Sequence, residues 1–273
     1  MIERLRRFWR KPLRDKIWSL RAHFAPWLPL LMRLDFGAWW LVWYDSVSDR
    51  IYHRHYEPNT QAFIRQFLRA GMVAFDVGAH HGFYTLLMAR CVGPQGLVVA
   101  FEPSPIERRK LVWHLRLNRL PWVRVEPYAL ADREGIMDFF LTKDNSANSL
   151  SPPEISPIVG KVTVPVTTLD TFCERAGIKR VNLIKVDVEG AELLVLKGAQ
   201  RILTEMRPII VMELSKRTTA RFGYSVDDLL AFLKQQGYQI RSVPNEENAI
   251  AEPIETKNNS DWRLAISDWW NGF

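Results

Sequence analysis

Short apolar blocks alternate with helical patterns over most of this chain. Strand-like apolar runs are predicted at 72–77, 97–102, 123–130, 181–188, 208–214 and 238–243. Between them, apolar positions three and four residues apart predict helices at 59–70, 84–90, 104–118, 167–177, 191–203 and 225–237. Strands that alternate with helices in this way predict an α/β fold with a doubly wound, mostly parallel sheet.

Two parts of the pattern depart from this alternation. Residues 136–142 and 161–166 predict an added strand pair, separated by a polar, proline-containing loop at 144–160 that is long enough for a lid or an acceptor loop. Residues 262–267 follow without a crossover helix, so we expect this last strand to insert antiparallel.

The N-terminal residues follow a helical pattern of their own. Apolar side chains recur at intervals of three and four from Ile2 to Phe24, which predicts an amphipathic helix, or two with Pro12 opening the second. Arginine and lysine oppose the apolar face, as in a helix that lies in a membrane interface. A helix packed on its own domain with a solvated basic face has the same periodicity, so both interpretations stay open.

Residues 24–44 are apolar and rich in tryptophan, but prolines and charges interrupt them. A charge at the centre of a spanning helix is costly, so we expect no membrane span, and we expect no secretory signal. We predict a helical subdomain that covers the core or contacts a bilayer surface, with peripheral membrane contact through residues 1–44. Its tryptophans could line an acceptor pocket, although packing is their commoner use: Trp27, Trp39, Trp40 and Trp43.

The chain therefore divides into a helical extension, residues 1–55, and a main domain, residues 56–273. Of the net charge of +7, residues 1–22 carry +6, from eight basic and two acidic side chains, which leaves +1 for the rest. A main domain so close to neutrality lacks the basic stripe that nucleic-acid binding requires. The two cysteines, Cys91 and Cys173, are too few for a disulfide framework and suit a reducing, cytoplasmic environment.

The stretch 75–90 combines a strand end, a turn of small residues and the start of a helix. Small residues let a ligand approach the backbone, and a carboxylate at Asp76 can meet a ligand ammonium. A dinucleotide fingerprint starting at Gly78 would need glycine where the chain has His80 and Phe83, which disfavours NAD and FAD. A ligand with a ribose but no pyrophosphate, such as S-adenosylmethionine, fits better; a structural turn without a ligand is the alternative.

Acidic residues close several of the predicted strands. Glu102 ends the second strand, 26 positions after Asp76, where a carboxylate is placed to accept both ribose hydroxyls. A second group follows the later strands and could act as a general base, orient an acceptor or hold a hard cation such as magnesium: Asp187, Glu189, Glu192 and Glu213. One of Glu189 and Glu192 is expected only to favour the N-terminus of the next helix.

These residues resemble a known family. FDVGAHHGFYT, VVAFEPSP, LNRLPWVRVEPYALAD, VTTLDTF and above all LIKVDVEGAELLVLKGA are similar to the FkbM-type S-adenosylmethionine-dependent methyltransferases, over residues 56–215. The resemblance implies a Rossmann-like class I methyltransferase fold, whose seven-stranded sheet has its last strand antiparallel. It also implies O-methylation of small molecules, sugars or natural-product scaffolds.

The resemblance implies roles for individual residues as well. The methionine part of the cofactor would be held by Asp76, Gly78, Ala79, His80 and Gly82. Glu102 would bind the ribose with Pro103 and Ser104 beside it, Asp132 would lie near the adenine, and Asp187 and Glu189 would face the transferred methyl group. The family often has asparagine where this chain has His80, and a histidine can still form hydrogen bonds.

Methyl transfer to a hydroxyl requires in-line alignment and the removal of a proton. Asp187 is the first candidate for the general base, and His80 or His81 is the second. In a variant of this mechanism, Asp187, Glu189 and Glu213 bind magnesium. A small-molecule or glycan O-methyltransferase is the favoured function. The competing hypotheses are a methyltransferase-like binding module without catalysis and an RNA or protein methyltransferase, the latter disfavoured for RNA by the near-neutral main domain.

Overall fold

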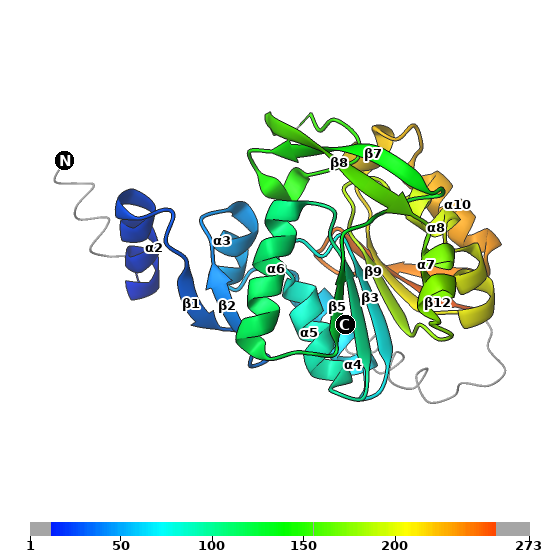
Figure 1. Cartoon of the computed structure of the whole chain (residues 1–273), viewed down its shortest axis with the longest axis horizontal. Helices are drawn as coiled ribbons and strands as arrows, with labels where there is room; N and C mark the ends of the chain where they lie inside the picture. Colours follow the sequence, from blue (N-terminus) through cyan, green and yellow to red (C-terminus); the bar gives the residue numbers. More distant parts are fainter. Residues whose placement is uncertain (1–11, 155, 255–273) are drawn as a thin grey trace. The chain divides into compact units, whose positions relative to one another are not determined.

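The computed structural model describes residues 12–154 and 156–254, and the chain divides into two compact units, Met1–Tyr56 and Glu57–Phe273 (Figure 1). The described part of the first unit holds two helices and two strands: α2 (Leu13–Phe24), β1 (Leu30–Arg33), β2 (Trp39–Val42) and α3 (Ser46–Tyr52). Part of the amphipathic pattern, residues 1–11, lies outside the described residues.

The predicted helical subdomain at 24–44 is wrong, because β1 and β2 form an antiparallel hairpin there. The chain reverses at Asp35, Phe36 and Gly37, where Gly37 has φ +84° and its N–H donates to the Leu34 carbonyl. Burial then alternates residue by residue along both strands, so the apolar run has the period of a strand rather than of a helix. The tryptophans also differ in environment: Trp40 is buried and Trp27 is exposed.

The second unit alternates strands and helices as predicted. Its elements up to the strand pair are α4 (Pro58–Phe67), β3 (Val73–Val77), α5 (Phe83–Val92), β4 (Leu97–Phe101), α6 (Pro105–Asn118), β5 (Val123–Glu126), β6 (Ala129–Leu130), β7 (Gly135–Thr142), η1 (Asn145–Ala147) and β8 (Ile158–Thr167). The remaining elements are α7 (Leu169–Ala176), β9 (Leu183–Val186), α8 (Glu192–Lys197), η2 (Ile202–Met206), β10 (Ile209–Glu213), α9 (Lys216–Ala220), α10 (Val226–Gln235), β11 (Tyr238–Ser242) and β12 (Asn248–Pro253).

Among the described residues, a seven-stranded sheet runs in the order β11-β12-β10-β9-β3-β4-β5. The pairs from β10 to β5 are parallel, and β12 is antiparallel to both of its neighbours, β10 and β11. Helices α4, α5 and α6 cover one face of the sheet, and α7, α8 and α10 cover the other (Figure 1). The doubly wound, mostly parallel sheet is therefore confirmed.

Two strand predictions need correction. The antiparallel strand is β12, which follows β11 after a short turn, and residues 262–267 lie outside the described residues. The run 123–130 is not one strand, since β5 stays in the main sheet and β6 pairs with β8 in a separate three-stranded sheet. Pro127 explains the break, because proline has no N–H to continue a hydrogen-bond ladder. The predicted strand pair is confirmed as β7 and β8.

The main core lies between the sheet and the α7, α8 and α10 layer. Three aromatic rings meet edge to face at its centre: Phe172 lies 4.8 Å from Phe101 and 6.2 Å from Phe75, measured between ring centroids. Phe75 and Phe101 belong to adjacent strands, and alternate residues of β3 and β4 point to the opposite face. Asp76 is therefore directed toward α5 and away from this core.

Candidate active site

The turn after β3 brings two strand ends into close contact. Gly78 has φ +81°, and a Cβ atom there would lie 1.8 Å from the carbonyl oxygen of Asp187, which follows β9. The N–H groups of Gly78 and Ala79 both donate to the Phe101 carbonyl at 3.0 Å, which holds the turn against the end of β4. Glycine is thus required here by the approach of another backbone segment.

We expect Gly78→Ala to destabilise the protein by at least about 3 kcal/mol, because the methyl group overlaps a backbone atom and the φ angle is unfavourable for alanine. Gly177→Ala is the matched control: Gly177 also has a positive φ, +66°, in the left-handed helical region, but a Cβ there meets no atom within 4 Å. The control should lose only about 1 kcal/mol. Urea unfolding measures both, and equal losses would show that the contact with Asp187 is unimportant.

Gly82 and His80 also have positive φ angles in this turn. Gly82 begins α5 with φ +88°, and a Cβ there would lie 2.1 Å from the Leu111 side chain of α6. His80 has φ +51°, a left-handed conformation that is uncommon for residues other than glycine. Such conformations are concentrated at functional sites, where the surrounding structure enforces them.

Glu102 follows β4 and is buried beside this turn. Its carboxylate accepts the N–H of His80 at 2.7 Å with Oε2 and the N–H of Ser104 at 2.8 Å with Oε1. Burial raises the pKa of Glu102 to about 8, against the lowering effect of the two N–H groups. Each carboxylate oxygen can accept a further hydrogen bond, so the group is fixed in place and still able to bind two hydroxyls.

The neighbours of Glu102 have mainly structural contacts. Ser104 caps α6 by accepting the N–H of Glu107, and the Pro103 carbonyl accepts a hydrogen bond from Arg108 at 2.9 Å. Asp132 is exposed two residues beyond β6. The proposed contacts of Pro103, Ser104 and Asp132 with a cofactor therefore stay predictions.

Asp76 lies one residue inside β3 rather than at its end, and its side chain is 1% exposed. It accepts a hydrogen bond of 2.5 Å from the Thr85 hydroxyl of α5. Burial raises the pKa of Asp76, while Lys185 and Thr85 lower it. Lys185 is its cross-strand partner in β9. The predicted contact of Asp76 with a ligand ammonium stays a prediction.

Lys185 was not among the predicted site residues, although its buried ammonium group lies in this site. Its Nζ donates to Asp187 Oδ2 at 2.8 Å and lies 4.6 Å from the centre of the Tyr84 ring, and Tyr84 in turn donates to Glu57 at 2.5 Å. Burial alone would lower the pKa of Lys185, but Asp187, Glu57 and Asp76 outweigh it and raise the pKa. A lysine inside the apolar run LIKV was the available signal, since lysine is almost never buried without a partner.

The acidic strand ends form a second cluster. One carboxylate oxygen each of Asp187, Glu189 and Glu213 lies within 4.8 Å of the other two. Burial, with Asp187 as the next cause, raises the pKa of Glu189 to about 8 and that of Glu213 to about 9. Arg221 partly balances this charge, with Nη2 3.7 Å from Glu189 Oε2 and 2.8 Å from the Glu189 carbonyl.

Glu192 does not belong to this acidic cluster and stabilises the start of α8 instead. Its Oε1 accepts the N–H groups of Val188 and Gly190, at 3.2 and 3.1 Å, at the start of α8, and Oε2 accepts the Tyr224 hydroxyl at 3.3 Å. Glu192 is thus the member of the pair that supports the helix N-terminus. Glu189, with φ +54°, remains directed to the cluster.

The raised pKa of Glu213 predicts how stability depends on pH. The folded protein retains a proton that the unfolded chain releases above about 4.5, so the free energy of unfolding should fall as the pH rises from about 5 to about 9. We expect Glu213→Gln to flatten this decline and to be more stable than the wild type at pH 8 by about 1–3 kcal/mol. Urea unfolding at pH 5 and pH 8 tests it, with Glu247→Gln at an exposed position as the control. A parallel decline in wild type and Glu213→Gln would contradict it.

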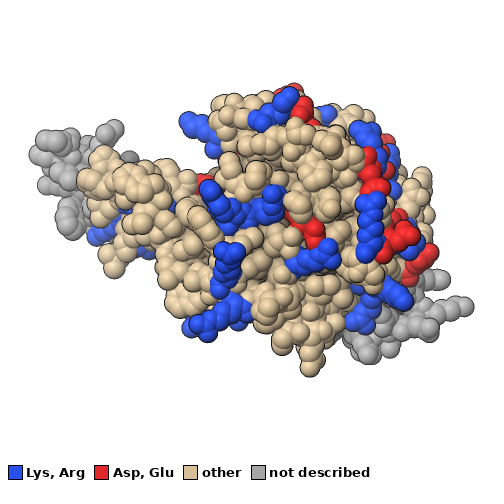
Figure 2. Space-filling model, in the orientation of Figure 1, with Lys and Arg blue, Asp and Glu red and all other residues tan. Residues whose placement is uncertain are grey.

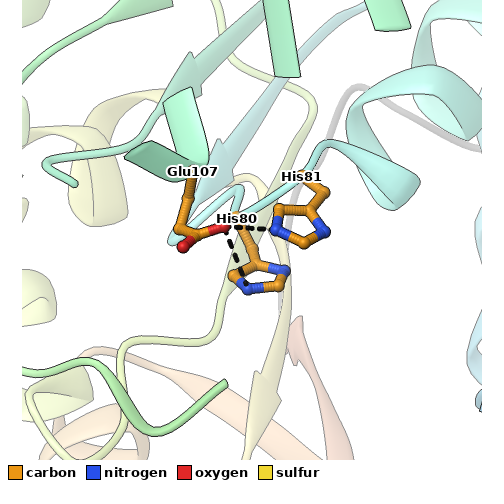
Figure 3. Close-up of side chains that lie close together, drawn as sticks. All are labelled: His80, His81 and Glu107. Carbon is orange, nitrogen blue, oxygen red and sulfur yellow. Dashed lines mark hydrogen bonds and ion pairs between the residues drawn. The ribbon is translucent and has the colours of Figure 1, made fainter. Parts of the chain in front are cut away.

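His80 and His81 lie together at the same turn, and their rings stack with centroids 3.8 Å apart (Figure 3). Burial lowers the pKa of His80 to about 3 and that of His81 well below 6.5, with the neighbouring cation Lys110 also lowering the pKa of His81. An imidazole with so low a pKa is a weak base, so the geometry favours a carboxylate as the base over either histidine.

A stretch of the loop between β7 and β8 contacts both sides of the site. Asn145 Nδ2 donates to Glu107 of α6 at 3.2 Å. The Ser149 hydroxyl donates to the Glu189 carbonyl at 3.2 Å, and the Ser151 hydroxyl to the Arg221 carbonyl at 3.4 Å. We call residues 144–151 the site strap. The proposed lid or acceptor role of this loop agrees with these contacts and stays a prediction.

The strand order, the antiparallel β12 and the acidic residues beside the β3 and β4 ends define a class I methyltransferase fold. Residues 76–240 match the methyltransferase FkbM domain family, a match over more than half of the chain. The chain belongs to this family.

Three curated relatives are similar over the same region. "Methyltransferase 1" of Beauveria bassiana is 30% identical over 157 residues, 51% of this chain and 63% of the relative. "2-O-methyltransferase NoeI" of Sinorhizobium fredii is 28% identical over 50% of this chain and 60% of the relative. "31-O-demethyl-FK506 methyltransferase FkbM" of Streptomyces tacrolimicus is 27% identical over 57% and 66%. The chain thus spans less than two thirds of the length of these three proteins.

Proposed function

We propose that this protein transfers a methyl group from S-adenosylmethionine to a hydroxyl oxygen of a sugar or another small molecule. Family membership supports the reaction class, and the names of two relatives, a 2-O-methyltransferase and a 31-O-demethyl-FK506 methyltransferase, support oxygen as the methylated atom. Two unpaired thiols, Cys91 and Cys173, agree with action in a reducing compartment.

One observation carries the proposal: the acidic cluster lies directly against the glycine turn. The N–H of Asp187 donates to the Val77 carbonyl at 3.0 Å, and the Asp187 carbonyl touches Gly78. Glu102, the carboxylate predicted to bind the ribose hydroxyls, lies on the other side of the same turn and accepts the N–H of His80. S-adenosylmethionine supplies the methyl group on a cationic sulfur, and a cluster of carboxyl oxygens is suited to face that charge.

Glu189 is better suited than Asp187 to remove the hydroxyl proton. A general base works best when its pKa is near the working pH, and the pKa of Glu189 is raised to about 8. Asp187 is instead paired with Lys185 at 2.8 Å, which leaves it to position the cluster. We propose no magnesium here, because Lys185 and Arg221 already contact two of the three carboxylates.

The test is methyl transfer from labelled S-adenosylmethionine to a panel of sugars and hydroxylated small molecules. Glu189→Gln should lower kcat by about a hundredfold or more and leave the Kd for S-adenosylmethionine within about threefold. Glu205→Gln, in η2 away from the cluster, is the matched control and should leave both values unchanged. Cofactor binding without turnover on any acceptor would favour the non-catalytic binding module.

RNA is not the proposed acceptor. Figure 2 shows lysine and arginine side chains in separate groups divided by uncharged surface on the visible face. Residues 23–273 carry a net charge of only +1, whereas RNA binding draws most of its affinity from a continuous basic surface. Methylation of RNA by the full chain, at a rate above that with hydroxylated small molecules, would reverse this assignment.

We further propose that the first unit docks on an anionic lipid bilayer. One face of α2 presents four exposed apolar side chains at helical spacing: Leu13, Ile17, Leu20 and Phe24. Trp27 is 75% exposed beside the end of this helix, and residues 1–22 carry a net +6 that complements anionic head groups. No helix among the described residues is long and apolar enough to cross a bilayer.

Vesicle sedimentation tests the docking. We expect the full chain to bind phosphatidylcholine vesicles that contain about one third phosphatidylglycerol, and to bind pure phosphatidylcholine weakly. Ile17→Gln with Leu20→Gln should reduce binding about tenfold, because two apolar side chains no longer enter the interface. Ile136→Gln with Val159→Gln, which removes two even more exposed apolar side chains from the second unit, is the control. Unchanged binding, or a dimer in solution that the α2 substitutions dissociate, would refute docking on lipid.

A further inference from the structure

Two imidazoles and one carboxylate converge on a single point beside the glycine turn. His80 and His81 precede α5, and Glu107 lies in the first turn of α6. One ligand atom from each of the three side chains lies within 4.8 Å of the other two. Figure 3 shows a nitrogen of each ring facing the same Glu107 oxygen. We infer that these residues form a binding site for a divalent transition-metal ion, with Zn²⁺ as the best match.

The spacing of the three atoms suits a tetrahedral ion. Bonds of about 2.0–2.2 Å place neighbouring ligand atoms roughly 3.3 Å apart. His80 Nε2 already lies 3.8 Å from Glu107 Oε2. His81 Nε2 is hydrogen-bonded to the same oxygen and must move outward by a rotation of the Glu107 side chain. Two histidines and one glutamate are a known ligand set for zinc with an open fourth position.

The hydrogen bonding of His80 also favours a metal. His80 Nε2 is buried and has no hydrogen-bond partner within the part of the chain that the structure describes. A buried polar atom without a partner is costly, and a metal bond would remove that cost.

Supporting contacts hold the Glu107 side chain and the backbone of the two histidines in place. His114 Nδ1 lies 2.7 Å from the His81 carbonyl, and Asn145 Nδ2 donates to Glu107 Oε2 at 3.2 Å. Such surrounding hydrogen bonds orient metal ligands in known sites. Asn145 thus connects the site strap to Glu107. The backbone N–H of His80 donates to Glu102. A bound ion would therefore fix the turn after β3, which is hydrogen-bonded to Glu102.

Lys110 competes with the ion for this position. Its Nζ lies 2.9 Å from His81 Nε2 and 3.1 Å from Glu107 Oε2. An ammonium is thus placed where a cation is favoured, which shows the electrostatic character of the site. The Lys110 side chain is 18% exposed, so its flexible end can rotate into solvent when an ion binds. The alternative is that Lys110 is the permanent cation of the cluster, and the two hypotheses predict opposite results.

The experiment is a titration of the full, chelator-treated chain with Co²⁺, followed by visible absorption, and with Zn²⁺, followed by calorimetry. We expect one high-affinity ion per chain and a higher melting temperature with Zn²⁺. His80→Asn should weaken Zn²⁺ binding by about tenfold to a hundredfold or more. Asparagine tolerates the left-handed backbone of position 80, so this variant should fold. Glu107→Gln should weaken binding similarly.

Two controls separate this site from other candidate ligands. His53→Asn removes a histidine that lies 3.4 Å from both Asp15 and Asp49, and Glu213→Gln alters the acidic cluster. Both should leave the Zn²⁺ affinity unchanged. Lys110→Gln should tighten binding by about threefold to tenfold, since the competing charge is gone. The melting temperature of each metal-free variant confirms folding.

The outcomes that overturn the inference are distinct. No binding of Co²⁺ or Zn²⁺ to the wild type and to Lys110→Gln would leave Lys110 as the permanent cation. Binding that His80→Asn leaves intact would place the ion elsewhere. Each readout is made without S-adenosylmethionine, so failure of the metal site and failure of the proposed methyl transfer are separate results.

Discussion

Glu102→Ala should bind S-adenosylmethionine at least about a hundredfold more weakly than the wild type, measured as Kd by calorimetry. In the proposed complex, the substitution removes the hydrogen bonds that Glu102 would form with the ribose. It also leaves the N–H groups of His80 and Ser104 without their buried acceptor, so the turn that holds the ligand loosens. Both effects act in the same direction, which makes this the largest expected change in affinity.

Two further variants make this test specific. Glu102→Gln keeps one acceptor oxygen and the shape of the side chain, and should weaken binding by about tenfold. Glu134→Ala removes an exposed glutamate that pairs with Arg175 and should leave the Kd unchanged. If Glu102→Ala, shown to be folded by its melting curve, bound S-adenosylmethionine as tightly as the wild type, the ribose contact would be excluded.

Lys185→Met should lower the free energy of unfolding by about 3–5 kcal/mol. Lys185 is 2% exposed and is the cation that faces three carboxylates: Asp76, Asp187 and Glu57. Removing one partner of a buried ion pair leaves the other charges uncompensated in a medium that solvates them poorly. Urea unfolding at pH 7 measures the loss.

The same experiment contains its own control and a partial rescue. Lys161→Met breaks an exposed ion pair with Asp138 and should cost less than about 1 kcal/mol. Glu57→Gln added to Lys185→Met should recover part of the stability, because one uncompensated carboxylate is removed. A loss in Lys185→Met no larger than that in Lys161→Met would mean that the buried network does not stabilise the fold.

The order of strands and helices was predictable, because the central strands β3, β4, β9 and β10 are almost fully buried, mainly apolar runs bounded by turn residues. The positions of Asp76 and Glu102 near the glycine turn were predictable too, since strand ends in such sheets meet at one edge. The hairpin at 30–42 was missed because the apolar run was matched to a helix and the turn Asp35–Gly37 was overlooked. The break of the strand at 123–130 was signalled by Pro127 alone.

The side chains that join distant segments were not predictable from sequence. Glu107 lies three residues after the N-cap Ser104, a spacing that suggests a helix cap, yet its carboxylate is bonded to His81, 26 positions earlier. Arg221 reaches Glu189 from the segment after α9. Such contacts depend on how α5, α6 and α9 are placed on the sheet, and no local periodicity reports that placement.

The site strap has a thermodynamic consequence. Hydrogen bonds from Asn145, Ser149 and Ser151 join it to segments on both sides of the site, and each such bond is worth about 0.5–1.5 kcal/mol net. Their sum, roughly 1.5–4.5 kcal/mol, is a lower bound on the cost of releasing the strap, because Ala147 and Ser149 are also buried, so at most about one molecule in ten has the strap released. If the acceptor enters and the methylated product leaves only when the strap is released, each of these steps is preceded by the equilibrium between the attached and the released strap. The rate of entry and of product release would then be proportional to the fraction of molecules with a released strap.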